Sequence, residues 1–227
     1  ELMHRLTAGQ DDIVVGFSVD LRRHYKFADK LVGYMVNTLP LRTKFEQIHT
    51  FSELIKDVSM KLKGALENST VPFHMIVDQL KMPRSASRQS LVQTMFTFVH
   101  ERPQTILGHR WEPVELIDVD AQMELAIAVV EEENNRMQVS IEYNSDLFDE
   151  STAGRIFNCF SALVDNATSN PDLPLFSLQI IPADQLNVQI RQWNRTEMEF
   201  PKHLCLHHLF EQTVRSNPDA ISLIHNN

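Results

Sequence analysis

Histidines are the first candidates for chemistry in this chain of 227 residues. His207 and His208 form the only adjacent pair, but they lie in a helical pattern with apolar neighbours, so we interpret them as structural. His203 and His207 stand four residues apart, which suits two metal ligands, yet no nearby Cys, Asp or Glu completes a set. The sequence also contains no serine nucleophile elbow and no carboxylate pair that can be assigned to one cleft. We therefore predict neither a metal site nor a catalytic group within this chain.

A second candidate is the polar pair Asn37 and Thr38, which interrupts an apolar run at 32–42. Gly33 permits a tight bend at the start of this run, and the following apolar residues are typical of a buried extended segment: Val36, Leu39 and Leu41. A buried asparagine needs hydrogen-bond partners. The residue types alone predict a core strand in which Asn37 binds neighbouring backbone groups.

A third candidate is the densest basic cluster of the chain, Arg22-Arg23-His24-Tyr25-Lys26, with Lys30 beyond it. One interpretation is a solvated loop, because charged side chains are usually exposed. The other is a binding surface for an acidic partner or a phosphate group. The formal net charge of −9 argues against nucleic acid as a partner.

Composition limits the class of protein. Hydrophobic residues make up 43% of the chain, as in ordinary globular proteins. We see no signal peptide and no run of about 18 apolar residues, so no membrane span is predicted. Cys159 and Cys205 each lie in an apolar helical pattern, which predicts buried free thiols and favours a cytoplasmic protein. The first residue is not Met, and we expect both ends to be cut from a longer polypeptide.

The elements that must position these candidates form an α/β pattern. Turn signals and alternation predict strands at 13–19, 92–99, 111–119, 123–129 and 137–143, the last two forming a hairpin. Helical periodicity and a capping box beginning at Thr50 predict a helix at 50–67, and Pro72 begins another at 72–80. A long helix capped by Asp149 or Ser151 ends at 169–171. The first domain is expected to close near 178, before a short amphipathic helix from about 180 to 193.

Three stretches resemble the condensation domains of non-ribosomal peptide synthetases. Gly-Gln-Asp-Asp-Ile-Val-Val-Gly at 9–16 is similar to G-Q-x-D-I-V-V-G in that family, and 32–42 resembles I/V-G-x-F-V-N-T-x-x-x-R. Ile-Glu-Tyr-Asn-Ser-Asp-Leu-Phe-Asp at 141–149 resembles E-Y-N-T-D-L-F-D. The residues at 193–220 resemble the passage from a condensation domain into an adenylation domain.

Two further stretches match the family only in part. In the family's H-Q-D-V-P-F-E motif, the central Val71-Pro72-Phe73 is present, whereas four positions depart: Asn68, Ser69, Thr70 and His74. In R-D-x-S-R-N-P-L, the matching residues are Arg84, Ser87, Arg88 and Leu91, and the departures are Ser85, Gln89 and Ser90.

The resemblance implies a chloramphenicol-acetyltransferase-like sandwich lobe, in which helices pack against a mixed sheet. It assigns 1–178 to the C-terminal lobe of a condensation domain, 179–201 to an interdomain linker and 202–227 to a truncated adenylation domain. The implied reaction is amide formation between acyl or peptidyl and aminoacyl thioesters, both carried on phosphopantetheine. The family's H-H-x-x-x-D-G motif belongs to the N-terminal lobe, so the catalytic His is expected upstream, and the fragment alone is expected to be inactive.

The resemblance also suggests roles for individual residues. We expect Asn37, Thr38 and Arg42 to face the cleft between the lobes, with Asn37 orienting a substrate or the catalytic loop. A second set is expected to fix loops or to dock a carrier: Arg22, Arg23, Lys26, Arg84 and Arg88. The expected partners are peptidyl carrier domains, the upstream N-terminal lobe and the downstream adenylation domain. No cofactor is expected to bind this chain, because it lacks a Gly-rich phosphate loop.

Two alternatives stay open at this point. The departures at 68–74 and 83–91 are also compatible with a non-catalytic lobe that only docks carrier proteins. An epimerisation-type relative of the same fold is the other alternative. The Asn37-Thr38-Leu39-Pro40 pattern and the adenylation-like linker favour condensation over epimerisation.

Overall fold

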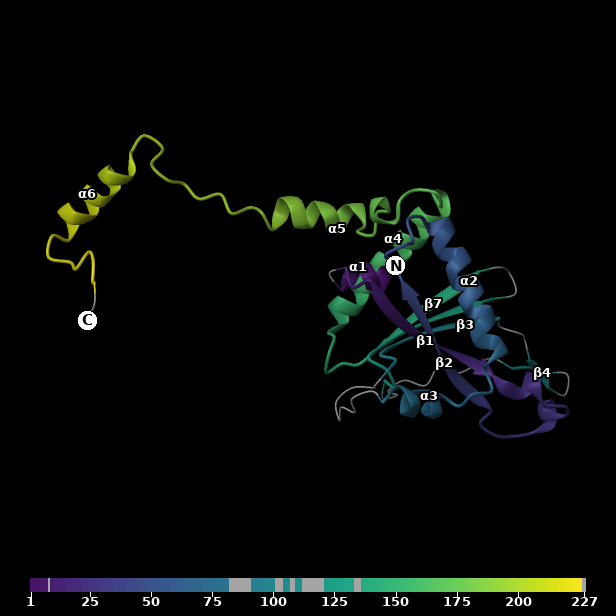
Figure 1. The fold of residues 1–227 in the computed structure, drawn as a ribbon. Coiled ribbons are helices and arrows are strands. Elements are labelled where there is room, and N and C mark those ends of the chain that lie inside the picture. Colours follow the sequence, from purple (N-terminus) through teal and green to yellow (C-terminus); the bar gives the residue numbers. More distant parts are fainter. Residues whose placement is uncertain are drawn as a thin grey trace. The chain divides into compact units, whose positions relative to one another are not determined.

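The computed structural model describes residues 1–7, 9–81, 91–100, 104–106, 109–111, 121–132 and 136–225. The chain divides into two compact units, Glu1–Pro182 and Ala183–Asn227 (Figure 1). None of the described helices is long and apolar enough to cross a membrane.

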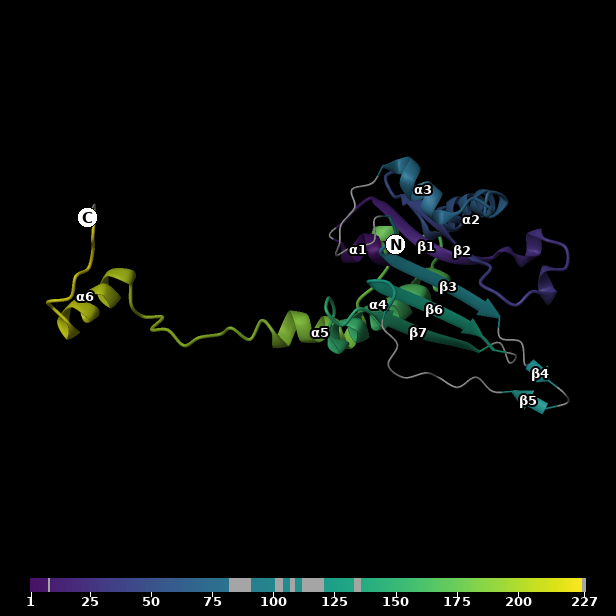
Figure 2. The ribbon, with the colours of Figure 1, turned by 90° about the horizontal axis from the view of Figure 1, so that it is seen from below.

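The first unit is built on a five-stranded mixed sheet with the order β2-β1-β3-β6-β7 (Figure 2). Its strands are β1 (Asp12–Asp20), β2 (Val36–Lys44), β3 (Thr94–His100), β6 (Leu125–Glu131) and β7 (Met137–Tyr143). The three central strands β1, β3 and β6 are parallel, and the two edge strands are antiparallel to their neighbours. This arrangement confirms the predicted mixed sheet, the hairpin and the strands near 13–19 and 92–99.

A separate two-stranded sheet pairs β4 (Gln104–Ile106) with β5 (His109–Trp111). The strand predicted at 111–119 lies outside the described residues apart from Trp111, which belongs to β5.

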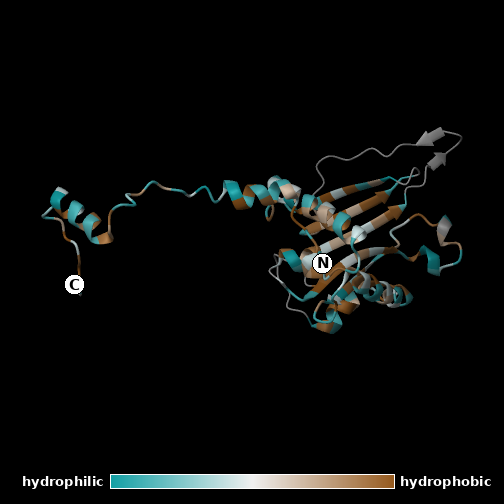
Figure 3. Ribbon diagram, turned by 90° about the horizontal axis from the view of Figure 1, so that it is seen from above, coloured by the Kyte–Doolittle hydropathy of each residue, from teal (hydrophilic) through white to brown (hydrophobic). Residues whose placement is uncertain are grey.

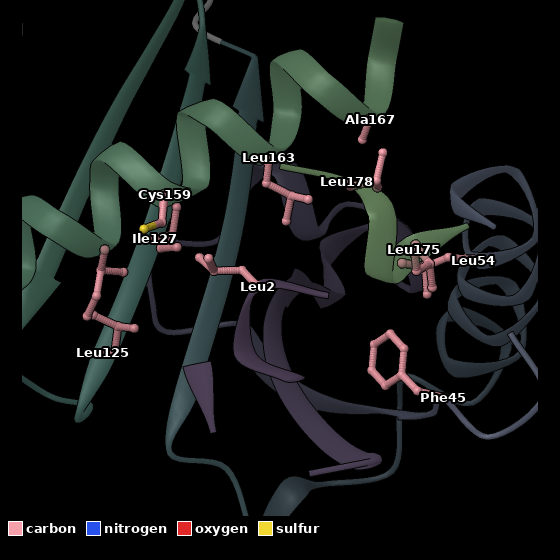
Figure 4. Close-up of a cluster of buried hydrophobic side chains, with 11 residues drawn as sticks. Leu2, Phe45, Leu54, Leu125, Ile127, Cys159, Leu163, Ala167, Leu175 and Leu178 are labelled. Carbon is pink, nitrogen blue, oxygen red and sulfur yellow. The ribbon is translucent and has the colours of Figure 1, made fainter. Parts of the chain in front are cut away.

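One face of the five-stranded sheet carries the core. The directly paired residues of each strand share a face, and one such row contains Leu39, Phe17, Phe96, Ile127 and Ile141. Ile127 belongs to a buried cluster with Cys159 and Leu163 of the long helix α4 (Glu150–Ser169). Figure 4 shows these two side chains projecting from α4 toward the sheet, with Leu2 of α1 (Leu2–Leu6) beside them. The same cluster includes Leu54 of α2 (Phe51–Glu67), so these three helices cover one face.

Hydropathy follows this arrangement. The strands are largely apolar, whereas α2 and α4 alternate apolar and hydrophilic residues (Figure 3). Such alternation is expected for helices with one face on a core and one in water. In β7 the residues of the opposite face are exposed, namely Gln138, Ser140 and Glu142.

The helix boundaries follow from capping. Thr50 accepts a hydrogen bond from the backbone N–H of Glu53 (3.2 Å), as predicted, but the Glu53 carboxylate accepts from His49 N (2.8 Å). The capping box is therefore displaced by one residue, and the hydrogen bond from His49 lowers the pKa of Glu53. Asp149 caps α4 through Thr152 N (2.6 Å), and hydrogen bonds led by that from the Ser151 hydroxyl lower its pKa.

The two cysteines differ. Cys159 is buried in the core face of α4, as predicted, and burial raises the pKa of its thiol. Cys205 is exposed, so its predicted burial is wrong. It stands at the N-cap of α6 (Leu206–Ser216), ahead of the helical pattern, and no residue of that helix is buried.

The remaining elements are short. The first unit contains the 3-10 helices η1 (Leu21–His24), η2 (Ala28–Lys30) and η3 (Leu175–Ser177), and the α-helix α3 (Phe73–Leu80). In the second unit, α5 (Ala183–Asn187) continues into the π-helical turn η4 (Val188–Gln192). This helix begins three residues later than the sequence predicts, because Pro182 disfavours the helical conformation at Ile181.

Candidate functional site

The side chain of Asn37 joins β2 to the loop between α2 and α3. Its Nδ2 donates to the carbonyls of Ser69 (2.9 Å) and Val71 (2.7 Å). Its Oδ1 accepts from the backbone N–H of Phe73 (3.1 Å). Because the two carbonyls face the amide nitrogen and the N–H faces the amide oxygen, the three contacts fix the orientation of the amide.

These bonds compensate for a missing helix cap. Helix α3 begins at Phe73, one residue later than predicted, and its N-cap is Pro72, which makes no side-chain cap hydrogen bond. The first N–H groups of a helix lack partners within the helix. Asn37 lies in β2, and its Oδ1 accepts the hydrogen bond of the Phe73 N–H. It therefore caps α3 from outside the helix.

The 68–74 stretch departs from the family pattern in its side chains, but Asn37 contacts only its backbone. The carbonyls of Ser69 and Val71 and the N–H of Phe73 are present whatever the side chains are. The departures therefore leave this contact between the two motif-like stretches intact.

Thr38 and Arg42 lie on the other face of β2 from Asn37. Side chains alternate along a strand, and the Thr38 methyl group lies 3.5 Å from where a Cβ on Gly16 would stand. Arg42 forms a two-pronged ion pair with Asp12 of β1, with Nε 2.8 Å from Oδ1 and Nη2 2.5 Å from Oδ2. This pair lowers the pKa of Asp12 and raises that of Arg42. The three residues expected at one cleft are thus divided between two faces.

Within the basic cluster, Arg22 holds the loop around it. Asp20 accepts a hydrogen bond from Arg22 N (3.0 Å) and contacts its guanidinium (3.3 Å), while Nη2 donates to the carbonyl of Gly33 (2.8 Å). Arg23 and Lys26 are exposed and form no ion pair with other described residues. Arg84 and Arg88 lie outside the described residues.

A contact between His24 and Ser69 is not predictable from the sequence. The Nε2 atom of His24 lies 2.8 Å from the Ser69 hydroxyl, and Ser69 is fully buried. Neither stretch alone signals this contact, because 45 residues separate the partners. We call the group His24, Asn37, Ser69, Val71 and Phe73 the Asn37 junction; it brings together η1, the start of β2, the α2–α3 loop and the start of α3.

The second unit shows no comparable site among its described residues. The rings of His207 and His208 lie 4.0 Å apart, and His208 Nδ1 accepts from Cys205 N (3.3 Å), which helps to cap α6. Across the described residues of both units, no group of three or more His, Cys, Asp or Glu side chains is placed to hold a metal ion.

Comparison with known proteins places this architecture in a family. The family model "Condensation domain" matches residues 2–189. The chain belongs to the condensation-domain family. A linear gramicidin synthase polypeptide from Brevibacillus parabrevis is 32% identical over 227 residues, which cover 98% of this chain and 4% of that synthase. Malpinin synthetase from Mortierella alpina is 30% identical over 220 residues, which cover 96% of this chain and 3% of that synthetase.

Solved structures show the same fold. Holo-AB3403, a four-domain nonribosomal peptide synthetase bound to AMP and glycine, matches 96% of this chain and 18% of its own with a TM-score of 0.78 and 17% identity. The starter condensation domain of rhizomide synthetase RzmA matches 80% of this chain and 42% of its own, with a TM-score of 0.64 and 20% identity. The sheet and its helices therefore form a chloramphenicol-acetyltransferase-like condensation-domain lobe. This chain spans a small part of the two synthetases and less than half of that starter domain.

Proposed function

We propose that this chain is the C-terminal lobe of a condensation domain, and that it helps to form amide bonds in a non-ribosomal peptide synthetase. The amine of an aminoacyl thioester attacks the thioester carbonyl of an acyl or peptidyl donor. An amide forms, and the phosphopantetheine thiol of the donor carrier leaves with a proton. The supporting observation is the Asn37 junction, which joins the two motif-like stretches at 32–42 and 68–74.

In this proposal the lobe helps to position the substrates and does not supply the catalytic histidine. The catalytic histidine belongs to the N-terminal lobe, and the two lobes hold both thioesters in line between them. Positioning of this kind contributes several kcal/mol to lowering a reaction barrier. The role of Asn37 is to hold the α2–α3 loop and the start of α3 in place, so that the wall of the cleft keeps its shape.

Carrier domains deliver both substrates in the same proposal. Arg23 and Lys26 are exposed and unpaired among the described residues, which suits contact with an acidic surface. Arg22 instead holds the loop that carries them.

Residues 179–201 are proposed as the linker and 202–227 as the start of an adenylation domain.

The test uses the parent polypeptide, extended on both sides, with carriers loaded with model aminoacyl groups. Mass spectrometry measures the dipeptidyl thioester. Asn37→Ala removes all three bonds to the α2–α3 loop, and the rate is expected to fall at least about tenfold, in line with the cost of misplaced reactants. The matched control is Asn158→Ala on the exposed side of α4, which should keep the wild-type rate.

Unchanged product formation by folded Asn37→Ala protein would remove the role assigned to Asn37. A wild-type parent that binds carrier but forms no product across a broad panel would favour the docking-only alternative. Loss of product on changing the histidine motif of the N-terminal lobe would confirm the reaction.

A further inference from the structure

Residues 20–35, which we call the 20–35 segment, expose several large apolar side chains close together in sequence. The exposed set is Tyr25, Phe27, Leu31, Val32 and Tyr34. Three exposed cations lie among them, namely Arg23, Lys26 and Lys30. Large exposed apolar patches usually mark interaction sites, and aromatic residues with Arg are enriched at the centres of protein interfaces.

Phe27 gives this surface a second distinctive feature. Its φ of 68° places it in the left-handed region, which is unfavourable for a bulky residue, and its side chain is 73% exposed. A residue that is both strained and exposed does not contribute to the folded state through packing. Strained residues of this kind cluster at active sites, ligand clamps and switch regions.

The segment is nevertheless held in one place. Arg22 bridges its two ends by binding Asp20 and the Gly33 carbonyl, and Ala28 in its middle is fully buried. The bond from His24 to Ser69 is its side-chain link to the α2–α3 loop. Asn37 binds the carbonyl of the same Ser69, so the segment and the start of β2 are tied to one residue.

We propose that His24 and Ser69 are positioning residues whose hydrogen bond holds the 20–35 segment in a docking orientation, and that an acidic carrier domain contacts it through Tyr25 and Phe27. The carrier is the occupant favoured by charge, because the cations around these rings complement an acidic surface. The carrier's identity rests on the proposed function, whereas the positioning role of His24 and Ser69 does not.

Hydrogen–deuterium exchange on the 227-residue chain tests the positioning role. The amides of Tyr25, Ala28, Lys30 and Leu31 bind carbonyls within the segment and report its opening. Ser69→Ala and His24→Ala should each speed their exchange about fivefold, the effect of one lost hydrogen bond. The double variant should exchange no faster than either single variant, because both changes remove the same bond.

Two variants sharpen this test. His24→Gln places an amide nitrogen near the position of Nε2, so it should restore slow exchange with Ser69 present and have no such effect in Ser69→Ala. Ser59→Ala on the exposed side of α2 is the control and should leave the segment unchanged. Additive effects of the two single changes, or no rescue by His24→Gln, would overturn the positioning role.

Binding of an isolated, phosphopantetheinylated carrier domain to the parent polypeptide tests the docking role. Phe27→Ala should raise the dissociation constant at least about tenfold, as expected for a central aromatic contact. The control is Phe176→Ala, an exposed phenylalanine of the same unit outside the segment. Ser69→Ala should raise the KM for the carrier substrate by a larger factor than it lowers kcat.

Equal binding by Phe27→Ala and wild type would overturn docking of the carrier here and indicate that another part of the synthetase covers the surface. A parent that binds the carrier through Phe27 but forms no dipeptide would overturn the proposed function and leave this inference standing.

Discussion

The buried apolar cluster extends under both ends of the five-stranded sheet, but the two ends differ in the contacts that accompany it. At the β6–β7 end, α4 packs apolar side chains onto strands that are neighbours in sequence or nearly so. At the β1–β2 end, polar contacts join segments that are far apart in the chain, such as Asn37 with the α2–α3 loop and His24 with Ser69. Apolar packing stabilises the fold at both ends, whereas the polar contacts of the β1–β2 end place loops at the candidate site.

The largest expected effect lies at the apolar end. Leu163→Ala removes a side chain from the buried cluster under α4 and leaves a cavity, so the free energy of unfolding should fall by about 3 kcal/mol. Its sequence neighbour Val164 is 41% exposed, and Val164→Ala should cost less than about 1 kcal/mol. Urea denaturation followed by circular dichroism measures both. Similar losses for the two variants would contradict the assigned face of α4.

A smaller but more diagnostic effect is expected at the polar end. Asn37→Asp keeps an acceptor for Phe73 N and replaces the two donors with a charge facing the carbonyls of Ser69 and Val71. The free energy of unfolding at neutral pH should fall by about 2 kcal/mol, the cost of unsatisfied and repelled polar groups.

The pH dependence of this variant has a definite sign. The carbonyls raise the folded-state pKa of the introduced carboxyl above its unfolded value, because they disfavour the charged form. Above the folded pKa the penalty is complete, and it disappears as pH falls toward the unfolded pKa. Relative to wild type, the variant should therefore recover stability on acidification. A deficit that does not change with pH would show that Asn37 Nδ2 does not face these carbonyls.

The same contrast explains what the sequence could predict. Alternation in 123–129 and 137–143 and the 3.6-residue period of 150–169 arise from contacts with one face of a core, so they are visible locally. The strand placement of Asn37 follows from the apolar residues around it. Its partners Ser69, Val71 and Phe73 do not, because a hydrogen bond to a backbone group leaves no trace in the identity of the bonded residue.

Two other features of the candidate site depend on the folded chain and could not be predicted from the sequence. The family resemblance suggested that Asn37, Thr38 and Arg42 face one cleft, but strand alternation separates Asn37 from the other two. The hydrogen bond between His24 and Ser69 joins the basic cluster to the 68–74 stretch, which matches the family motif only in part. Only folding brings the two side chains within 2.8 Å.

The smallest effect on stability is expected for the ion pair of Arg42 with Asp12, which is a polar contact exposed to solvent. Both side chains are well exposed, so water and salt screen their attraction. The pair lowers the folded-state pKa of Asp12 below its ordinary value of 3.8. Its contribution to stability is therefore present above pH 3.8 and is lost as pH falls through the lower folded-state pKa.

Arg42→Ala should accordingly lower stability slightly near neutral pH, less than either change above, and the difference from wild type should vanish in acid. Added salt should shrink that difference at neutral pH. Denaturation at several pH values and two salt concentrations measures both trends, with Lys63→Ala on the exposed side of α2 as the control. A large loss that is independent of salt would mean that Arg42 contributes through packing on the β1–β2 hairpin, and the polar end would then resemble the apolar one.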